Sequence, residues 1–427
     1  MGTVIQFAAL AVLLILTLYL AQLLYGGFRS TRLATGIAES ERKLMQTRVA
    51  EIMGKWDFER EKNEFSWNGF RKFEVARKVP EGGGICSFYL RPHDGKPLPS
   101  FNPGQYLTFR LDVPGQSKPV MRCYSLSDSP NPEYYRVSIK AVPPPRDKPD
   151  VPPGLSSNFF HNSINEGDIL DVKAPGGHFY LDTTKHTPVV LIGGGIGLTP
   201  VMSMLNQITE SGSTRETHFF YGVRNRAEHV MKEHLEQKAL EHENVTLHIC
   251  YSNPTDDDVQ GRDYQHGERV GAELFKRVLP SSNYEYYFCG PPPMMNSLFE
   301  GLREWGVPED DINYEAFGPA TVQKKKEADK SGGEAPAADA AASDIEVTFG
   351  KSGKTVKWDA GIGSLLDFAE ENGIDIDFGC RAGNCGTCIT AIKSGDVDYI
   401  SEPGEKPESG SCLACVSVPK GPLVLDA

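Results

Sequence analysis

The sequence predicts a multi-domain fold: a transmembrane helix, an antiparallel β-barrel, an α/β domain and a small C-terminal α+β domain. Three observations lead to this prediction. An uncharged apolar run opens the chain, short strands separated by Gly and Pro follow it, and buried strands then alternate with helical stretches. With 427 residues, each domain has enough chain to bury a core of its own.

The composition is that of an ordinary globular protein, with 39% hydrophobic and 24% charged residues. The net charge of −13 argues against nucleic acid as a partner, because surfaces that bind phosphate backbones are usually basic. From Asp344 onward the chain has 14 acidic and 7 basic residues, so about half of the excess, −7, belongs to the last domain. The nine cysteines do not resemble a disulfide framework, which indicates a reducing compartment.

The first 28 residues carry no charge, and the run from Val4 to Leu24 is almost wholly apolar. As a helix, these 21 residues would span about 32 Å, enough to cross the hydrocarbon of a membrane. Basic residues follow from Arg29 onward, and the positive-inside rule places them in the cytoplasm. We therefore expect a membrane anchor over residues 1–28, in contact with lipid, and a juxtamembrane stalk over 29–64. The expected location is the inner membrane, single-pass, with the soluble domains on the cytoplasmic side.

The two domains that follow differ in the spacing of their apolar residues. Residues 65–185 contain many short alternating strands, which is typical of an antiparallel barrel; we expect strands at 71–75, 85–90, 105–111 and 135–140. Residues 186–318 favour a parallel α/β sheet, with strands at 189–192, 217–221, 245–251 and 284–289 and helices at 200–209 and 227–240. Residues 319–343 are rich in Ala, Lys and Glu and are predicted to form a flexible linker.

The last domain, residues 344–427, has four cysteines in a recognisable spacing. C-x4-C-x2-C with a distant fourth cysteine is the plant-type pattern for a [2Fe–2S] cluster, and the ligands would be Cys380, Cys385, Cys388 and Cys415. The domain contains no histidine, which excludes the two His ligands of a Rieske centre. Zinc is the alternative metal, although this spacing is uncommon for it. We expect a β-grasp fold with two strands near 344–358 and a helix over 364–372.

A glycine-rich turn lies between a buried strand and a helix in the α/β domain, in the segment LIGGGIGLTP. Glycines let the backbone approach a pyrophosphate, and the following helix offers free N–H groups. The candidate residues are Gly194, Gly195, Gly197, Thr199 and Pro200. Such a turn alone is weak evidence, since tight turns also use Gly for steric reasons, and it does not match G-x-G-x-x-G.

Three motifs occur in order: Arg122-Cys123-Tyr124-Ser125-Leu126-Ser127, the glycine turn, and Cys289-Gly290-Pro291-Pro292. With them, residues 65–319 resemble the ferredoxin–NADP reductase superfamily, in which a flavin-binding barrel precedes a pyridine-nucleotide domain. The resemblance implies FAD, with FMN as the alternative, and NADH, with NADPH as the alternative. With the iron–sulfur domain last, the domain order resembles the reductase components of bacterial oxygenases such as phthalate dioxygenase.

The resemblance also implies roles for particular residues. Flavin contacts would come from Arg122, Tyr124, Ser125, Val137, Ser138, Lys140, Gly154, Ser156, Ser157 and Phe317. Residues at the hydride-transfer site would be Ser125, Cys289 and Glu315, with Cys289 beside the nicotinamide, and Gly290 and Pro291 would also contact a cofactor. Nucleotide contacts would include Arg224 and Arg226, in a segment without an acid. It also assigns Cys415 rather than the nearby Cys412 as the last cluster ligand.

Several of these residues could instead have a purely structural role. Tyr124 and Ser125 would otherwise be ordinary barrel residues, Cys289 would be a small buried hydrophobe, and the two arginines would be solvated loop charges.

Together these patterns predict an NAD(P)H-dependent flavin/[2Fe–2S] reductase. Its expected partner is a membrane-associated electron acceptor, an oxygenase, hydroxylase or desaturase, with a basic patch that docks against the acidic last domain. The alternative is the NADH-oxidising subunit of a sodium-pumping quinone reductase, whose domain order is helix, ferredoxin, reductase. We do not expect a nitric-oxide dioxygenase, because no globin-like segment precedes the barrel, nor a non-catalytic redox sensor, for which the complete motif set would be superfluous.

Overall fold

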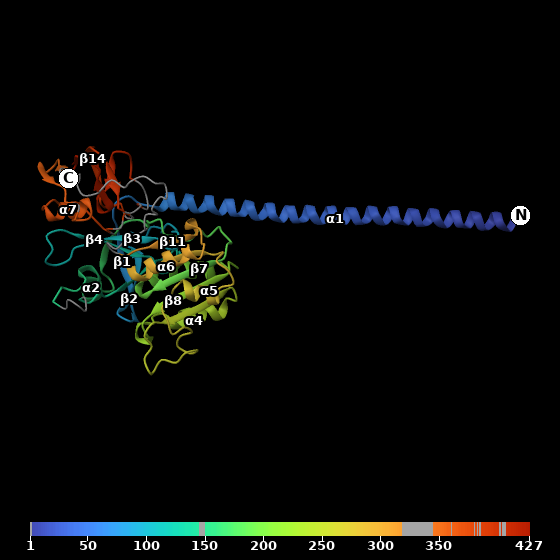
Figure 1. Cartoon of the computed structure of the whole chain (residues 1–427), viewed down its shortest axis with the longest axis horizontal. Coiled ribbons are helices and arrows are strands. Elements are labelled where there is room, and N and C mark those ends of the chain that lie inside the picture. Colours follow the sequence, from blue (N-terminus) through green and yellow to red (C-terminus); the bar gives the residue numbers. More distant parts are fainter. Residues whose placement is uncertain are drawn as a thin grey trace, which may run out of the picture. The chain divides into compact units, whose positions relative to one another are not determined.

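The structure is a computed structural model of the chain (Figure 1). It describes residues 2–427 except 145–149, 318–344, 360, 380, 382, 384–385, 401–402 and 404–406. The predicted linker, 319–343, therefore lies outside the described residues. Two units make up the chain, Met1–Glu64 and Phe65–Ala427, and each is considered by itself.

The first unit is formed by one helix, α1 (Gly2–Phe65), which runs through both the predicted anchor and the predicted stalk. Polar Thr17 and Gln22 interrupt its apolar part, and charged residues begin at Arg29. In the described part of the chain, no helix combines the length and the apolar character needed to cross a membrane. The predicted transmembrane anchor in contact with lipid therefore has no support in the described residues, and the predicted inner-membrane location is not upheld.

The second unit begins with a six-stranded antiparallel sheet in the order β4-β3-β6-β1-β2-β5. Its strands are β1 (Arg71–Gly82), β2 (Ile85–Pro92), β3 (Tyr106–Leu111), β4 (Val120–Ser125), β5 (Tyr135–Lys140) and β6 (Ile169–Val172). A bridge between Leu126 and Val137 joins the end of β4 to β5, so the two edge strands meet and the sheet closes into the predicted barrel. Helix α2 (Leu155–Asn162) inserts Phe160 into the barrel core.

A five-stranded parallel sheet follows in the order β11-β10-β7-β8-β9. Its strands are β7 (Val189–Gly194), β8 (Thr217–Val223), β9 (Val245–Tyr251), β10 (Glu285–Cys289) and β11 (Ile312–Glu315). Its helices are α3 (Leu198–Glu210), α4 (Lys232–Glu241), α5 (Ala272–Val278) and α6 (Pro292–Glu304). Two separate apolar clusters cover the sheet, one with side chains of α3 and α4 and the other with side chains of α5 and α6. This is the predicted α/β arrangement with helices on both faces.

The C-terminal part contains a five-stranded sheet, β13-β12-β18-β14-β16, and a two-stranded sheet, β15-β17. The strands are β12 (Glu346–Phe349), β13 (Lys354–Lys357), β14 (Ile389–Ser394), β15 (Val397–Tyr399), β16 (Ser411–Leu413), β17 (Ser417–Pro419) and β18 (Leu423–Leu425). Helix α7 (Leu365–Glu371) starts at Ser364, which forms a reciprocal capping box with Asp367. The two strands and the helix expected in this region are confirmed.

One expected helix, 227–240, is broken in the structure. A short 3₁₀ turn, η2 (Arg226–Glu228), precedes α4, and Met231 between them has a φ of +52°. This left-handed conformation is unfavourable for a non-glycine residue and cannot continue a right-handed helix. The helical pattern of the segment therefore begins only at Lys232.

Candidate active site

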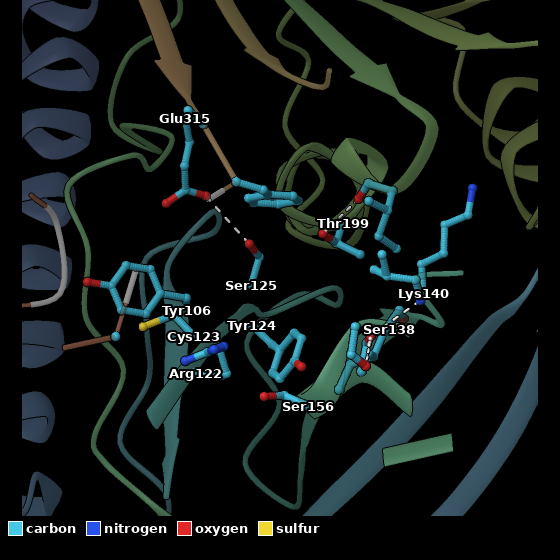
Figure 2. A pocket seen from close by; sticks show the side chains of 18 of the residues that line it. Tyr106, Arg122, Cys123, Tyr124, Ser125, Ser138, Lys140, Ser156, Thr199 and Glu315 are labelled. Carbon is cyan, nitrogen blue, oxygen red and sulfur yellow. Dashed lines mark hydrogen bonds between the residues drawn. The ribbon is translucent and has the colours of Figure 1, made fainter. Parts of the chain in front are cut away.

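A cavity of about 440 Å³ lies where the barrel meets the carboxyl edge of the parallel sheet (Figure 2). Its walls come from β4, β5, the start of α2, the start of α3 and the segment after β11. The predicted site residues that line it are Arg122, Tyr124, Ser125, Ser138, Lys140, Gly154, Ser156, Ser157, Thr199, Glu315 and Phe317. Eleven sequence-predicted residues from five segments thus share one cavity.

Strand β4 places its motif residues in very different surroundings. The Tyr124 ring packs edge-on against Phe109 and Phe160, and its burial raises the pKa of the phenol. Arg122 donates from Nη1 to the Met121 carbonyl at 2.6 Å, and burial lowers the pKa of its guanidinium. A half-buried cation on the cavity wall would be stabilised by an anionic ligand.

The turn at the start of α2 fits a phosphate group. Ser156 is 4% exposed, and its hydroxyl has no hydrogen-bond partner among the described residues. Ser157 Oγ accepts from the Val142 N–H and donates to the Gly154 carbonyl, both at 3.2 Å, which fixes the turn. A Cβ at Gly154 would lie 2.8 Å from Ser157 Oγ, so the close approach requires glycine. A hydroxyl without a hydrogen-bond partner beside a helix N-terminus, in the same cavity as Arg122, suits a flavin pyrophosphate.

Two buried side chains on the sheet side of this cavity, Ser125 and Glu315, come from separate strands, and buried Cys289 lies next to Glu315 on a third strand. Ser125 Oγ on β4 donates to Glu315 Oε2 at 3.5 Å (Figure 2). Glu315 pairs with Cys289 across β10 and β11. Burial raises the pKa of Glu315 to about 8, so this side chain is mainly protonated at neutral pH. Cys289 is fully buried, and burial raises the pKa of its thiol, which holds it in the neutral form.

A second cavity, of about 710 Å³, follows the carboxyl ends of β7, β8 and β10 and shares Lys140, Ile196 and Phe317 with the first. Predicted residues along it are Lys140, Gly194, Gly195, Gly197, Arg224, Gly290, Pro291 and Phe317. This edge of a parallel sheet is where dinucleotides bind in α/β proteins.

The glycines of the turn are required by space in this second cavity. A Cβ at Gly197 would lie 2.1 Å from the Cys289 carbonyl oxygen, and one at Gly194 would lie 2.6 Å from Met294 Sδ. The turn therefore lets two backbone segments touch, and this leaves room for an extended ligand over the sheet.

Some predicted residues lie elsewhere. Val137 is fully buried in the barrel core, and Pro200 is buried within α3. Arg226 and Cys289 are absent from the described lining of both cavities, although Cys289 directly precedes Gly290, which lines the second. Alternating side chains of a strand face opposite sides, so Val137 points into the core while Ser138 faces the cavity.

The nucleotide cavity also contains an acid that was not among the predicted residues. Glu228 lines it, and its Oε1 accepts from Arg224 Nε at 2.7 Å. Burial raises the pKa of Glu228, but the hydrogen bond and positive charge of Arg224 outweigh this effect, so the pKa lies below its usual value. The i,i+4 spacing of the two residues was a signal for this pair. Arg269 also lines the cavity, and no sequence motif marks it.

Two of the four predicted cluster ligands fall within the described residues. Cys388 Sγ and Cys415 Sγ lie 3.1 Å apart, well beyond the length of a disulfide bond, and both side chains are buried. Cys380 and Cys385 lie outside the described residues. Cys412 is fully buried on β16, and burial raises the pKa of its thiol to about 12. The proximity of Cys388 to Cys415 fits two thiolates of one cluster and favours Cys415 as the ligand.

The segment around the cluster cysteines reaches the flavin cavity. Gly379 and Arg381 line that cavity together with the barrel residues. The Phe378 ring has the Arg381 guanidinium at 4.0 Å and the Arg122 guanidinium at 5.7 Å from its centre. Arg381 is held in turn by Asp367 at 3.1 Å and by Glu370. An aromatic ring between two arginines thus connects the flavin cavity to the cluster segment.

Three protein families match successive parts of the chain. The oxidoreductase FAD-binding domain matches residues 85–180, the oxidoreductase NAD-binding domain matches 191–299, and the 2Fe-2S iron–sulfur cluster binding domain matches 347–420. These matches support FAD, NADH and a [2Fe–2S] cluster as the cofactors.

Known proteins share parts of this architecture. The flavohemoprotein of Bacillus cereus is 42% identical over 259 residues, which cover 60% of this chain and 63% of that protein. The chain thus spans about three fifths of the length of the curated relatives it matches. The FAD/NAD-binding domain of the nitric oxide dioxygenase of Vibrio cholerae is 30% identical with a TM-score of 0.52 and covers 59% of this chain and 100% of its own.

The structure of phthalate dioxygenase reductase covers 84% of this chain and 98% of its own, at 26% identity and a TM-score of 0.52. It is described as a modular structure for electron transfer from pyridine nucleotides to [2Fe–2S]. From the motifs, the joined cavities and these matches, the chain belongs to the ferredoxin–NADP reductase superfamily, with its FAD-binding, NAD-binding and 2Fe-2S domains in the order of phthalate dioxygenase reductase.

Proposed function

We propose that this protein takes electrons from NADH and delivers them, through FAD and the [2Fe–2S] cluster, to an oxygenase, hydroxylase or desaturase. The observation that carries the proposal is the junction of the two cavities at Lys140, Ile196 and Phe317. A flavin in the first cavity and a nicotinamide in the second would meet at this junction. The cluster segment, through Gly379 and Arg381, lies on the wall of the flavin cavity.

The residues of the first cavity would bind and orient the flavin. Arg122 and the Ser156 hydroxyl would bind its pyrophosphate, and the Tyr124 ring would pack against it. Bound FAD supplies the capacity to accept a hydride from nicotinamide and to release electrons one at a time. Ser125 offers a hydroxyl at the cavity wall, and its hydrogen bond to Glu315 orients that hydroxyl. Neutral Glu315 and neutral Cys289 keep negative charge away from the site where the hydride moves.

The second cavity favours NADH over NADPH. Glu228 places a carboxylate in the cavity and occupies the guanidinium fork of Arg224. A 2′-phosphate would meet this negative charge, and Arg224 would not be available to neutralise it.

The electron acceptor is proposed from charge and from domain order. The last domain carries −7, so we expect a basic docking patch on the acceptor. The order of domains is that of phthalate dioxygenase reductase, which points to an oxygenase-type acceptor.

The decisive experiment follows both cofactors in the purified, FAD-loaded protein. Anaerobic NADH should bleach the flavin absorbance and then reduce the cluster, seen as its electron paramagnetic resonance signal. In Cys415→Ser, NADH should still reduce the flavin, but the cluster signal should be lost, because a thiolate ligand is removed. The matched control is Cys412→Ser, which should retain the cluster. Flavin that NADH fails to reduce would refute the proposed function, and loss of the cluster in the Cys412 variant alone would reverse the ligand assignment.

A further inference from the structure

The segment that follows the flavin-binding strand β4 is hydrogen-bonded to helix α3 of the nucleotide domain. Ser203 Oγ donates to the Asp128 carbonyl at 2.6 Å, and Asn206 Nδ2 donates to Asp128 Oδ1 at 2.7 Å. Ser203 and Asn206 are both fully buried. Asp128 thus receives two hydrogen bonds from buried side chains of the neighbouring domain, where water does not compete.

The other carboxylate oxygen of Asp128 is held by its own domain. Tyr134 donates its hydroxyl to Oδ2 at 3.1 Å, and Arg136 Nη1 lies 3.4 Å from the same oxygen. Arg136 is 9% exposed, so this cation is also largely removed from water. One side chain therefore has one oxygen fixed in the barrel and the other bonded to α3.

The contact extends along α3 and reaches α4. His234 Nε2 lies 2.8 Å from Asn206 Oδ1, and burial lowers the pKa of His234, so the ring is neutral and donates from Nε2. Ser129, next to Asp128, donates its hydroxyl to Glu210 at the end of α3. Two helices of the nucleotide domain are thus connected to one barrel loop.

Helix α3 carries this contact to the site where the cofactors would meet. The helix begins directly after the turn of Gly195 to Gly197, which lines the nucleotide cavity, and Thr199 in its first turn lines the flavin cavity. Ser203 follows Thr199 by four residues, about 6 Å along a rigid helix. On the barrel side, Asp128 follows Ser125 by three residues. The position of α3 against Asp128 therefore sets the position of the glycine turn against the flavin cavity.

We propose that Asp128 is a positioning residue for hydride transfer: through Ser203 and Asn206 it fixes the separation between a nicotinamide at the glycine turn and a flavin in the barrel. The inference rests on the proposed function. Misplacement of reacting atoms by about 1 Å can cost on the order of 10²-fold in rate, so a small shift of α3 has a large effect. Asp128 itself touches neither cavity in their described linings.

The test uses the FAD-loaded full-length protein and measures reduction of the flavin by NADH in a stopped-flow instrument. Asp128→Ala should slow hydride transfer by about 10- to 100-fold, while the dissociation constant for NADH changes by less than about threefold. The kinetic isotope effect with NADH deuterated at the transferred position should also increase. Asp128→Asn keeps an oxygen that accepts from Asn206 and should retain most of the rate.

Matched variants separate positioning from general stability. Asp171→Asn removes a barrel carboxylate that pairs with Arg110 within the same domain, and it should leave the hydride-transfer rate unchanged. Ser203→Ala removes one of the two hydrogen bonds and gives a second measurement if the Asp128→Ala variant does not fold; it should slow transfer by a smaller factor. The proposal is overturned if Asp128→Ala or Ser203→Ala lowers the melting temperature but leaves the rate and the isotope effect unchanged. Failure of the proposed function would appear separately, as wild-type protein whose flavin NADH does not reduce.

Discussion

At the scale of single residues, the ionisation of Glu315 connects the site to stability. Its carboxyl is 6% exposed, and burial raises its pKa to about 8, whereas an unfolded glutamate ionises near pH 4.5. Between these two values the folded protein holds a proton that the unfolded chain has released. The contribution of this group to stability is therefore complete below about pH 4.5 and is lost as the pH rises to about 8.

This direction of the pH dependence leads to a prediction for Glu315→Gln. The wild-type folding equilibrium should weaken by up to about tenfold per pH unit between pH 5 and 8 because of this residue. The glutamine variant cannot ionise, so its stability relative to wild type should rise across this range. Urea unfolding of the FAD-loaded proteins at several pH values measures this difference in the free energy of unfolding. If the free energy of unfolding had the same pH dependence in the two proteins, the buried, protonated state of Glu315 would be contradicted.

The preference for NADH over NADPH is also expected to depend on a single residue, Glu228. Glu228→Gln should raise kcat/KM for NADPH relative to NADH by about tenfold, equivalent to about 1.4 kcal/mol, because it removes the repulsion of a 2′-phosphate and releases Arg224. The exposed Glu233 on α4 provides the matched control, and Glu233→Gln should leave the ratio unchanged. A ratio that does not move in Glu228→Gln would remove this residue from nucleotide selection.

At the scale of elements, three histidines form a hydrogen-bonded row across the edge of the parallel sheet. His218 Nδ1 lies 3.1 Å from His248 Nε2, and His248 Nδ1 lies 3.2 Å from His266 Nε2. Glu216 Oε1 lies 3.3 Å from His218 Nε2 at one end. Neutral rings with the hydrogen on Nε2 satisfy every one of these contacts. Burial lowers the pKa of all three histidines, that of His248 to about 3.

The row predicts acid sensitivity of the nucleotide domain. Above about pH 6.5 the rings are neutral in both the folded and the unfolded chain. As the pH falls toward 3, His248 becomes protonated in the unfolded chain but stays neutral in the folded protein. Stability should therefore fall with pH in this window. His248→Gln should be less stable at pH 7 but should lose less stability between pH 6.5 and 4.5. The exposed His93→Gln on the barrel is the control, and an unchanged slope in His248→Gln would contradict the prediction.

The elements also show what a sequence can predict. Strands β5 and β9 coincide residue for residue with their predicted ranges, because a short apolar alternation bounded by turn residues determines them locally. The helix expected from residue 227 failed at Met231, whose left-handed backbone has no signal in its side chain. The apolar run at the start of the chain correctly indicated a helix, α1, but no helix in the described part of the chain has the length and apolar character of a membrane span.

At the scale of the whole molecule, the site was predictable where its residues belong to contiguous motifs. Arg122, Ser125 and the glycine turn were found because each motif is local. Arg381 and Asp128 were not found, because their role comes from contacts between distant segments; Asp128 and Asn206 are 78 residues apart. Only the folded chain brings such pairs together.

The charge of the last domain gives a prediction for the complete electron path. The proposed hydride transfer would take place where the two cavities join, so salt should leave NADH reduction of the flavin nearly unchanged. Transfer to a basic one-electron acceptor such as cytochrome c should slow several-fold as salt shortens the screening length from about 30 to 8 Å, because the −7 of this domain attracts the acceptor.

Substitutions of two exposed acidic residues can distinguish a local docking surface from an effect of the overall net charge. Asp377 is exposed beside Phe378 in the cluster segment, whereas Glu133 is exposed on the barrel. Asp377→Lys should reduce the rate with cytochrome c at low salt and flatten its salt dependence, while Glu133→Lys changes net charge equally and should have a much smaller effect. Equal effects of the two substitutions would mean that net charge alone steers the acceptor. A larger effect of Asp377→Lys would place the exit of electrons at the cluster segment, on the same wall that Arg381 presents to the flavin cavity.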